Sequence, residues 1–96
     1  MKPVRFSEEK NKWLKQKRGI DFERIIKAIK DGNPVKIIKH PNKKRYKNQK
    51  IYLVLIEKYI FLVPAVEEKE YVFFKTIYPS HKYTKIFFEL KVKKEL

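Results

Sequence analysis

Two segments near the start of the chain have the pattern of short helices. The first helix is predicted to begin after Ser7, whose hydroxyl is suited to cap it, and to end at Gly19. The second is predicted to begin after Asp21, which is also a suitable cap, and to end at the turn of residues 31–34. The apolar residues of this second helix recur at helical spacing: Phe22, Ile25, Ile26 and Ile29.

After Pro34, short apolar runs separated by polar turns predict β-strands. Four strands are expected, with the ranges Val35–Lys39, Ile51–Ile56, Tyr59–Val66 and Tyr71–Tyr78. Glu57 and Lys58 are predicted to form a two-residue hairpin turn between the two middle strands. Because Pro64 cannot donate a hydrogen bond to a neighbouring strand, we expect a bulge or a frayed end there.

The last segment begins with Ser80, which is suited to cap a third helix. A strand over residues 86–92 is the alternative, since Ile-Phe-Phe favours β-structure, but we favour the helix. The predicted fold is one α+β domain over residues 1–96. It has two N-terminal helices, a four-stranded antiparallel sheet with helices packed on one face, and a C-terminal helix. The residues of the last helix expected to face inward are Tyr83, Ile86, Phe87 and Leu90.

The chain is strongly basic, and its charge is unevenly distributed. It carries 25 Lys and Arg against 11 Asp and Glu, a formal net charge of +14. Residues 1–50 hold 17 basic and 5 acidic side chains, whereas residues 51–96 hold 8 and 6. Such an excess is usually kept for a polyanionic partner, so nucleic acid is favoured over a merely solvated, lysine-rich surface.

Composition excludes several classes of chemistry. The chain has no cysteine and only two histidines, His40 and His81, so we expect no disulfide, no thiolate nucleophile and no metal site or other cofactor. With two glycines there is no glycine-rich phosphate loop, and no carboxylate pair suited to two-metal catalysis stands out. No apolar run approaches the roughly 20 residues of a membrane span. We therefore expect a soluble cytoplasmic domain without a membrane partner or a signal peptide.

The richest basic segment is Lys36–Lys50, which holds seven Lys or Arg and no acid. It links two predicted strands and is too polar to be core, so it is either a solvated loop or a nucleic-acid-binding loop. We favour the second interpretation, with cations on phosphates and a tyrosine stacked on a base. The candidate RNA-binding residues are His40, Lys43, Lys44, Arg45, Tyr46 and Lys47.

A second candidate site lies around the predicted start of the last helix. Free backbone N–H groups after Ser80 would form an anion site, and histidine is the side chain whose ordinary pKa best suits proton transfer near neutrality. The alternative is a surface histidine among lysines. A nuclease built this way would need no metal, because the RNA 2′-hydroxyl would attack the adjacent phosphate. The candidate catalytic residues are Lys75, Tyr78, His81, Lys82 and Lys85.

Residues 6–11 read Phe-Ser-Glu-Glu-Lys-Asn, and residues 17–23 read Lys-Arg-Gly-Ile-Asp-Phe-Glu. These two stretches resemble the opening of BrnT toxins, with Arg18 in place of the usual histidine before the glycine. Residues 75–85 are similar to the family's last strand and following helix, and His81 falls where the family more often has arginine. The resemblance covers roughly residues 5–89, although the motifs that carry it are short.

The resemblance implies a RelE-like fold and the toxin of a type II toxin–antitoxin pair. Such toxins cleave messenger RNA without metal, free or on the ribosome, and a DNA-binding antitoxin neutralises them and contacts the operator DNA. The family's basic active-site stretch would fall on Lys75, His81, Lys82 and Lys85. Two explanations of His81 stay open: it is the general acid or base, or it is an attenuating substitution that leaves the protein weakly active.

We expect His81 to act as acid or base, Lys75 and Lys82 to hold phosphate, and Tyr78 to stack or donate a proton. A non-catalytic RNA- or DNA-binding module, such as a small ribosome-associated protein, is the alternative. Because the middle strands are almost continuously apolar, their second face should need a further cover. We expect an acidic antitoxin segment to provide it, over the basic face near Lys75 and Lys82.

Overall fold

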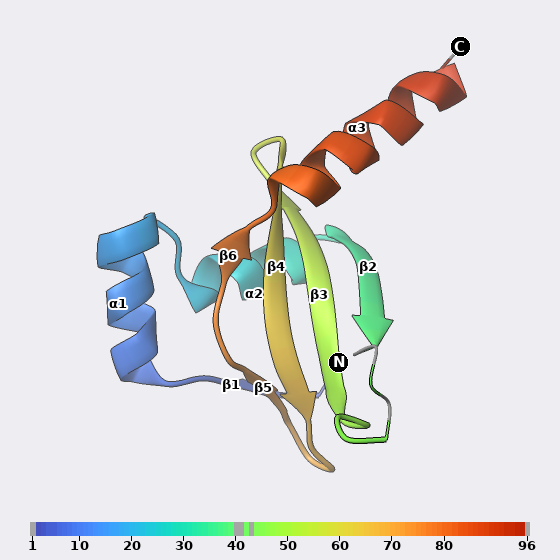
Figure 1. Cartoon of the computed structure of the whole chain (residues 1–96). Helices are drawn as coiled ribbons and strands as arrows, with labels where there is room; N and C mark the ends of the chain where they lie inside the picture. The colour runs from blue at the N-terminus through green and yellow to red at the C-terminus, as the bar shows by residue number, and fades with distance from the viewer. Residues whose placement is uncertain (1, 40–41, 43, 96) are drawn as a thin grey trace.

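The computed structural model of the chain describes residues 2–39, 42 and 44–95, which form three helices and six strands (Figure 1). Their bounds in chain order are β1 (Val4–Arg5), α1 (Glu8–Arg18), α2 (Phe22–Lys30), β2 (Pro34–Lys39), β3 (Gln49–Ile56), β4 (Tyr59–Glu67), β5 (Val72–Phe74), β6 (Tyr78–Pro79) and α3 (His81–Glu95). The predicted α+β class is confirmed, as are the three helices; the helix, and not the strand, forms after Ser80.

The sheet is mixed and larger than the four-stranded antiparallel sheet that the sequence predicted. Its strand order is β1-β5-β4-β3-β2, and β6 also pairs with β4. The short strand β1 pairs in parallel with β5, whereas the other pairs are antiparallel. The prediction of four strands was wrong because β1 has only two residues, too few for alternating polarity to reveal it, and because the predicted last strand is divided into β5 and β6.

The two N-terminal helices begin and end as their cap residues predict. The Ser7 hydroxyl accepts a hydrogen bond from the Lys10 N–H at 3.1 Å, and the Asp21 carboxylate accepts one from the Arg24 N–H at 2.8 Å. Gly19 ends α1 with a φ of 66°, a left-handed conformation that glycine adopts without steric cost.

Pro64 breaks the strand beside it and leaves its own strand intact. Strand β4 pairs with β3 through this position, where Pro64 lies opposite Ile51. The Pro64 carbonyl accepts a hydrogen bond from the Lys75 N–H at 2.8 Å, on the other side of β4. In an antiparallel ladder a residue's N and O point to the same side, so the missing N–H of Pro64 also faces that side. There the neighbouring strand is interrupted between Phe74 and Tyr78, which splits the predicted last strand into β5 and β6.

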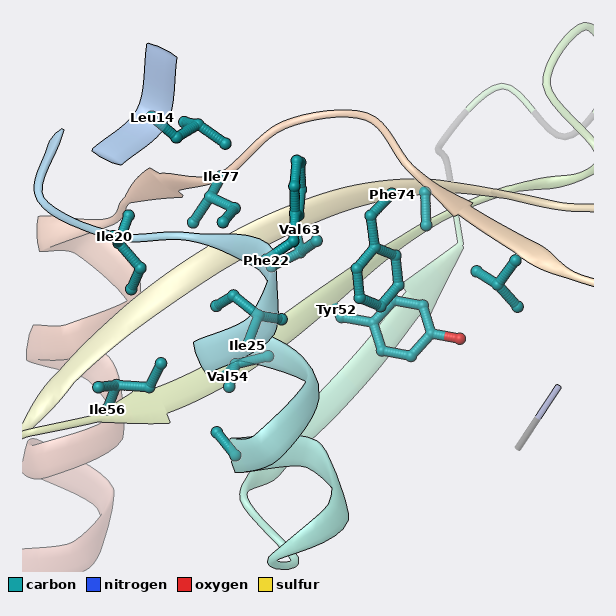
Figure 2. Packing of buried hydrophobic residues seen from close by; sticks show 13 residues of the cluster. Leu14, Ile20, Phe22, Ile25, Tyr52, Val54, Ile56, Val63, Phe74 and Ile77 are labelled. Atoms are coloured by element: carbon teal, nitrogen blue, oxygen red, sulfur yellow. The ribbon is translucent and has the colours of Figure 1, made fainter. Parts of the chain in front are cut away.

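The first face of the sheet is packed by α1 and α2. Figure 2 shows the side chains of this cluster between the helices and the strands, with Phe22, Tyr52 and Phe74 close together. The Tyr52 and Phe74 rings are 5.4 Å apart, and the Phe22 and Phe74 rings 6.3 Å. Leu14, from α1, and Ile25, from α2, are fully buried here.

The second face of the sheet is packed at one end by α3, so the prediction that the helices share one face was wrong. Its buried residues are Leu53, Ile60 and Leu62, and the α3 side chains Tyr83 and Phe87 pack against them. The helix leaves the sheet at the β3–β4 hairpin and then extends beyond the strands (Figure 1). Part of the second face therefore stays only half-buried, and its residues include Ile38, Ile51 and Leu55.

Candidate nucleic-acid interface

The start of α3 is fixed to the end of the β3–β4 hairpin by hydrogen bonds. The Ser80 N–H donates to the Ile60 carbonyl at 2.9 Å, and the Ile60 N–H donates to the Thr84 hydroxyl at 2.8 Å. The Ser80 hydroxyl accepts from the Tyr83 N–H at 3.1 Å, so Ser80 caps the helix as predicted. This cap leaves the backbone N–H groups of His81 and Lys82 without a hydrogen-bond partner among the described residues.

The side chains of the first turn of α3 are exposed and basic. His81, Lys82 and Lys85 all point to solvent. The Lys82 ammonium lies 5.7 Å from the centre of the Tyr83 ring, within range of a cation–π contact. Within the described residues, His81 and Lys85 form no side-chain hydrogen bond or ion pair, so both side chains are available to a ligand.

Lys75 lies in the interruption between β5 and β6, and its side chain is exposed. The Lys75 N–H donates a hydrogen bond to the Pro64 carbonyl, whereas the Ser80 N–H donates one to the Ile60 carbonyl. Pro64 and Ile60 are four residues apart along β4. At about 3.3 Å per residue the two places are about 13 Å apart. Lys75 and the first turn of α3 therefore belong to the same edge of the molecule, at a spacing that suits contacts along a nucleic-acid backbone.

Arg18 joins this edge although the sequence did not indicate it. Its guanidinium donates a hydrogen bond to the Ile77 carbonyl, inside the interruption that contains Lys75. The contact joins residues 59 positions apart, so no local pattern could reveal it. We call Arg18, Lys75, His81, Lys82 and Lys85 the edge cations.

Tyr78 does not lie among the exposed side chains of the candidate site. It pairs with Leu62 in the sheet and packs against the cluster on the second face. Its side chain is half-buried, which limits how far its ring could stack on a base. The role predicted for Tyr78 remains the least supported of the five.

The described residues of the loop between β2 and β3, which we call the basic loop, lie at the opposite end of the hairpin from the first turn of α3 (Figure 1). It precedes Gln49 at the start of β3, whereas α3 begins beside Ile60, and the length of β3 separates them by about 20 Å. Lys44, Arg45 and Lys47 are exposed, and the Arg45 guanidinium lies 5.4 Å from the centre of the Tyr46 ring. His40 and Lys43 lie outside the described residues.

An exposed tryptophan on α1 adds an aromatic side chain near Arg18. The Lys10 ammonium and the Arg18 guanidinium lie 4.2 and 5.0 Å from the centre of the Trp13 ring. The Trp13 side chain is large and apolar, yet it is 39% exposed. The Arg18 guanidinium therefore joins Trp13 to the edge where Lys75 and His81 lie.

Four acids of the described residues form ion pairs with basic residues outside the edge cations. Glu67 pairs with both Lys2 and Lys50, Asp21 with Lys15, Asp31 with Lys27, and Glu57 with Arg24. The hydrogen bond from Lys50 is the main cause that holds the pKa of the Glu67 carboxyl below its usual value. None of these acids is paired with an edge cation, so the edge keeps its positive charge.

Neither a metal cluster nor a membrane-spanning helix is found in the described part of the chain. No three His, Asp or Glu side chains there are placed to hold a metal ion. No helix there combines the length and the apolar composition needed to cross a bilayer. Comparison of the chain with protein-family models, curated proteins and solved structures gives no match.

Proposed function

We propose that the protein binds RNA along the edge cations and cleaves it without metal, as the toxin of a type II toxin–antitoxin pair. The observation that carries the proposal is the exposed cluster at the start of α3. It combines His81 with Lys82 and Lys85 and with two unpaired backbone N–H groups. Phosphate oxygens are the natural ligands of such a group, and the resemblance to BrnT toxins supports the RNA substrate.

In the proposed reaction, the RNA 2′-oxygen attacks its adjacent phosphorus while the bond from phosphorus to the 5′-oxygen breaks. The products are a 2′,3′-cyclic phosphate and a free 5′-hydroxyl. His81 accepts the proton of the 2′-hydroxyl, and a solvent water molecule donates a proton to the leaving 5′-oxygen. Lys75, Lys82 and Lys85 stabilise the negative charge that builds up on the phosphate oxygens.

Cleavage of a long RNA in the presence of EDTA tests the catalytic part of this proposal. We expect His81→Ala to slow cleavage on the order of 10²-fold or more, as loss of a general acid or base does. Lys85→Gln tests the contribution of charge, and Lys17→Gln is its control, because each removes one positive charge. Both lysines are exposed and helical, and neither has an ion-pair partner among the described residues. Only Lys85→Gln should weaken RNA binding, with the slope of log affinity against log salt falling by about one.

A non-catalytic RNA- or DNA-binding module is the second candidate, and one observation favours it. A general base is usually oriented by a hydrogen bond, yet none holds the His81 ring among the described residues. RNA binding with a Lys85-dependent salt slope, but without cleavage by the wild-type protein, would support this alternative. A salt slope unchanged in Lys85→Gln would contradict both candidates.

We also propose that a DNA-binding antitoxin is the partner, as the resemblance implies. Induction of the wild-type protein should arrest growth, and co-expression of the adjacent reading frame should relieve the arrest. Continued growth on induction of soluble wild-type protein would contradict the toxin assignment, while in vitro cleavage would still be measurable.

A further inference from the structure

An apolar hollow lies between α3 and the second face of the sheet. Its volume is about 190 Å³. The residues that line it are Lys36, Leu53, Ile60, Tyr83, Ile86, Phe87 and Leu90. Lys36, Leu53 and Ile60 belong to strands β2, β3 and β4 and form the floor, and the other four residues belong to α3 and form one wall.

The apolar residues of α3 form a continuous seam that the sheet covers only in part. Tyr83, Ile86, Phe87 and Leu90 follow the spacing i, i+3, i+4, i+7, which places them along one side of a helix. Tyr83 and Phe87 pack on the sheet, whereas Ile86 is 40% and Leu90 56% exposed. Ile86 and Leu90 extend the apolar side of α3 beyond the part that the sheet covers. Such an exposed apolar side is suited to pack against a second helix.

The charge around the hollow indicates an acidic occupant. Lys36 lines it, and α3 carries five lysines against the two acids Glu89 and Glu95. A second copy of the chain, itself at +14, would bring lysines against lysines. RNA would gain little from Ile86 and Leu90, because aliphatic side chains offer bases no ring on which to stack.

We propose that this hollow is the docking site of a partner protein's acidic amphipathic helix. The apolar side of that helix would pack on Ile86, Leu90 and the floor of the hollow, and its acids would face Lys36. The site differs from the predicted antitoxin position near Lys75 and Lys82. The inference rests on the shape and charge of the hollow and not on the proposed RNA cleavage.

A library of random peptides displayed on phage, selected on the wild-type protein, tests this proposal. We expect the selected peptides to be rich in Glu and Asp, with apolar residues at helical spacing. Their affinity should fall by about tenfold or more in the double variant Ile86→Ser/Leu90→Ser and in Leu90→Ser alone. Ile37→Ser is the matched control, because Ile37 is 49% exposed but lies on β2 opposite Tyr52, away from the hollow.

Charge reversal supplies a second measurement that does not alter the apolar seam. Lys36→Glu should weaken the selected peptides, because Lys36 lines the hollow, whereas Lys17→Glu on α1 should not. An empty selection, peptides without acidic residues, or affinities unchanged by the seam variants would overturn the proposal. So would a dimer in light scattering that Leu90→Ser dissociates, or RNA affinity that Leu90→Ser abolishes, because these results would assign the hollow to a second copy or to RNA.

Discussion

The two faces of the sheet are equally apolar in sequence but very differently covered. Seven of the eight largest fully buried side chains in the described chain belong to the first face, and only Ile60 belongs to the second. The difference follows from the helices. Helix α2 lies along the first face with α1 beside it, whereas α3 touches one end of the second face and then leaves it.

This contrast indicates that the first face serves mainly the stability of the fold and the second face mainly the binding of a partner. Burial of apolar surface supplies most of the driving force for folding, so the first face should dominate the free energy of unfolding. A face left half-covered contributes less to stability, and contiguous exposed apolar surface is more often retained for a partner. Substitutions on the two faces should therefore differ in what they change.

The largest expected effect is that of Phe74→Ala, in the middle of the first face. Phe74 is fully buried and contacts the rings of Phe22 and Tyr52. Its loss should lower the free energy of unfolding by about 3–5 kcal/mol, measured by urea denaturation. A loss below about 1 kcal/mol would show that the first face is not the main core.

The next largest effect is expected at Asn11, which joins the two helices that cover the first face. Its amide Nδ2 donates to both Glu23 carboxylate oxygens, at 2.9 and 2.8 Å, and its Oδ1 accepts from the Phe22 N–H at 2.8 Å. Asn11 is 4% exposed, so Asn11→Ala would leave the Phe22 N–H buried without a partner. We expect a loss of about 2–3 kcal/mol.

The same denaturation experiment separates this role from a general effect of losing an asparagine. The exposed Asn48 offers the control, and Asn48→Ala should change stability by less than about 0.5 kcal/mol. Equal losses in the two variants would contradict the role assigned to Asn11.

The sequence predicted the parts of the fold that local chemistry determines. Ser7, Asp21 and Ser80 cap the three helices as expected, because a cap depends on neighbours three residues away. The hairpin turn at Glu57 and Lys58 also forms, with both residues at positive φ. These features need no information from distant residues.

The remaining features depend on contacts between distant residues. The parallel pairing of β1 with β5 joins Val4 to Val72, and Arg18 reaches Ile77 across 59 positions. The sequence indicated that Pro64 would disturb the strand pairing. Which neighbouring strand it interrupts depends on the register of the sheet, which local residues do not determine. For the candidate site, residues within one turn of α3 were predicted to lie together and do so. The basic loop was predicted from its charge, and the structure places it at the other end of the hairpin.

On the second face, Leu55→Ala should have a smaller effect than the changes in the core. Leu55 is half-buried and packs against the second cluster, so its truncation leaves a surface depression and no closed cavity. We expect a loss of about 1 kcal/mol in urea denaturation. A loss as large as that of Phe74→Ala would remove the contrast between the two faces.

The smallest effect concerns the ion pairs of Glu67 at the open end of the β3–β4 hairpin and depends on pH. The hydrogen bond from Lys50 is the first cause that keeps the pKa of Glu67 below its ordinary value of 4.5. A carboxyl whose pKa is lower in the folded state contributes stability above the unfolded pKa, and this contribution is lost as the pH falls through the folded pKa. Part of the stability of the wild-type protein should therefore disappear as the pH is lowered below about 4.5.

Lys50→Met should remove this part of the acid sensitivity. Because both partners are about a third exposed, the difference at neutral pH should stay within roughly 0–1 kcal/mol. It should shrink further as Glu67 becomes protonated in both proteins, so the two stability curves converge in acid. Lys69→Met, at an exposed lysine without an ion-pair partner among the described residues, should run parallel to the wild type at every pH. Urea denaturation at several pH values between 2 and 7 measures all three curves, and a constant offset for Lys50→Met would show that Glu67 is not the group that responds.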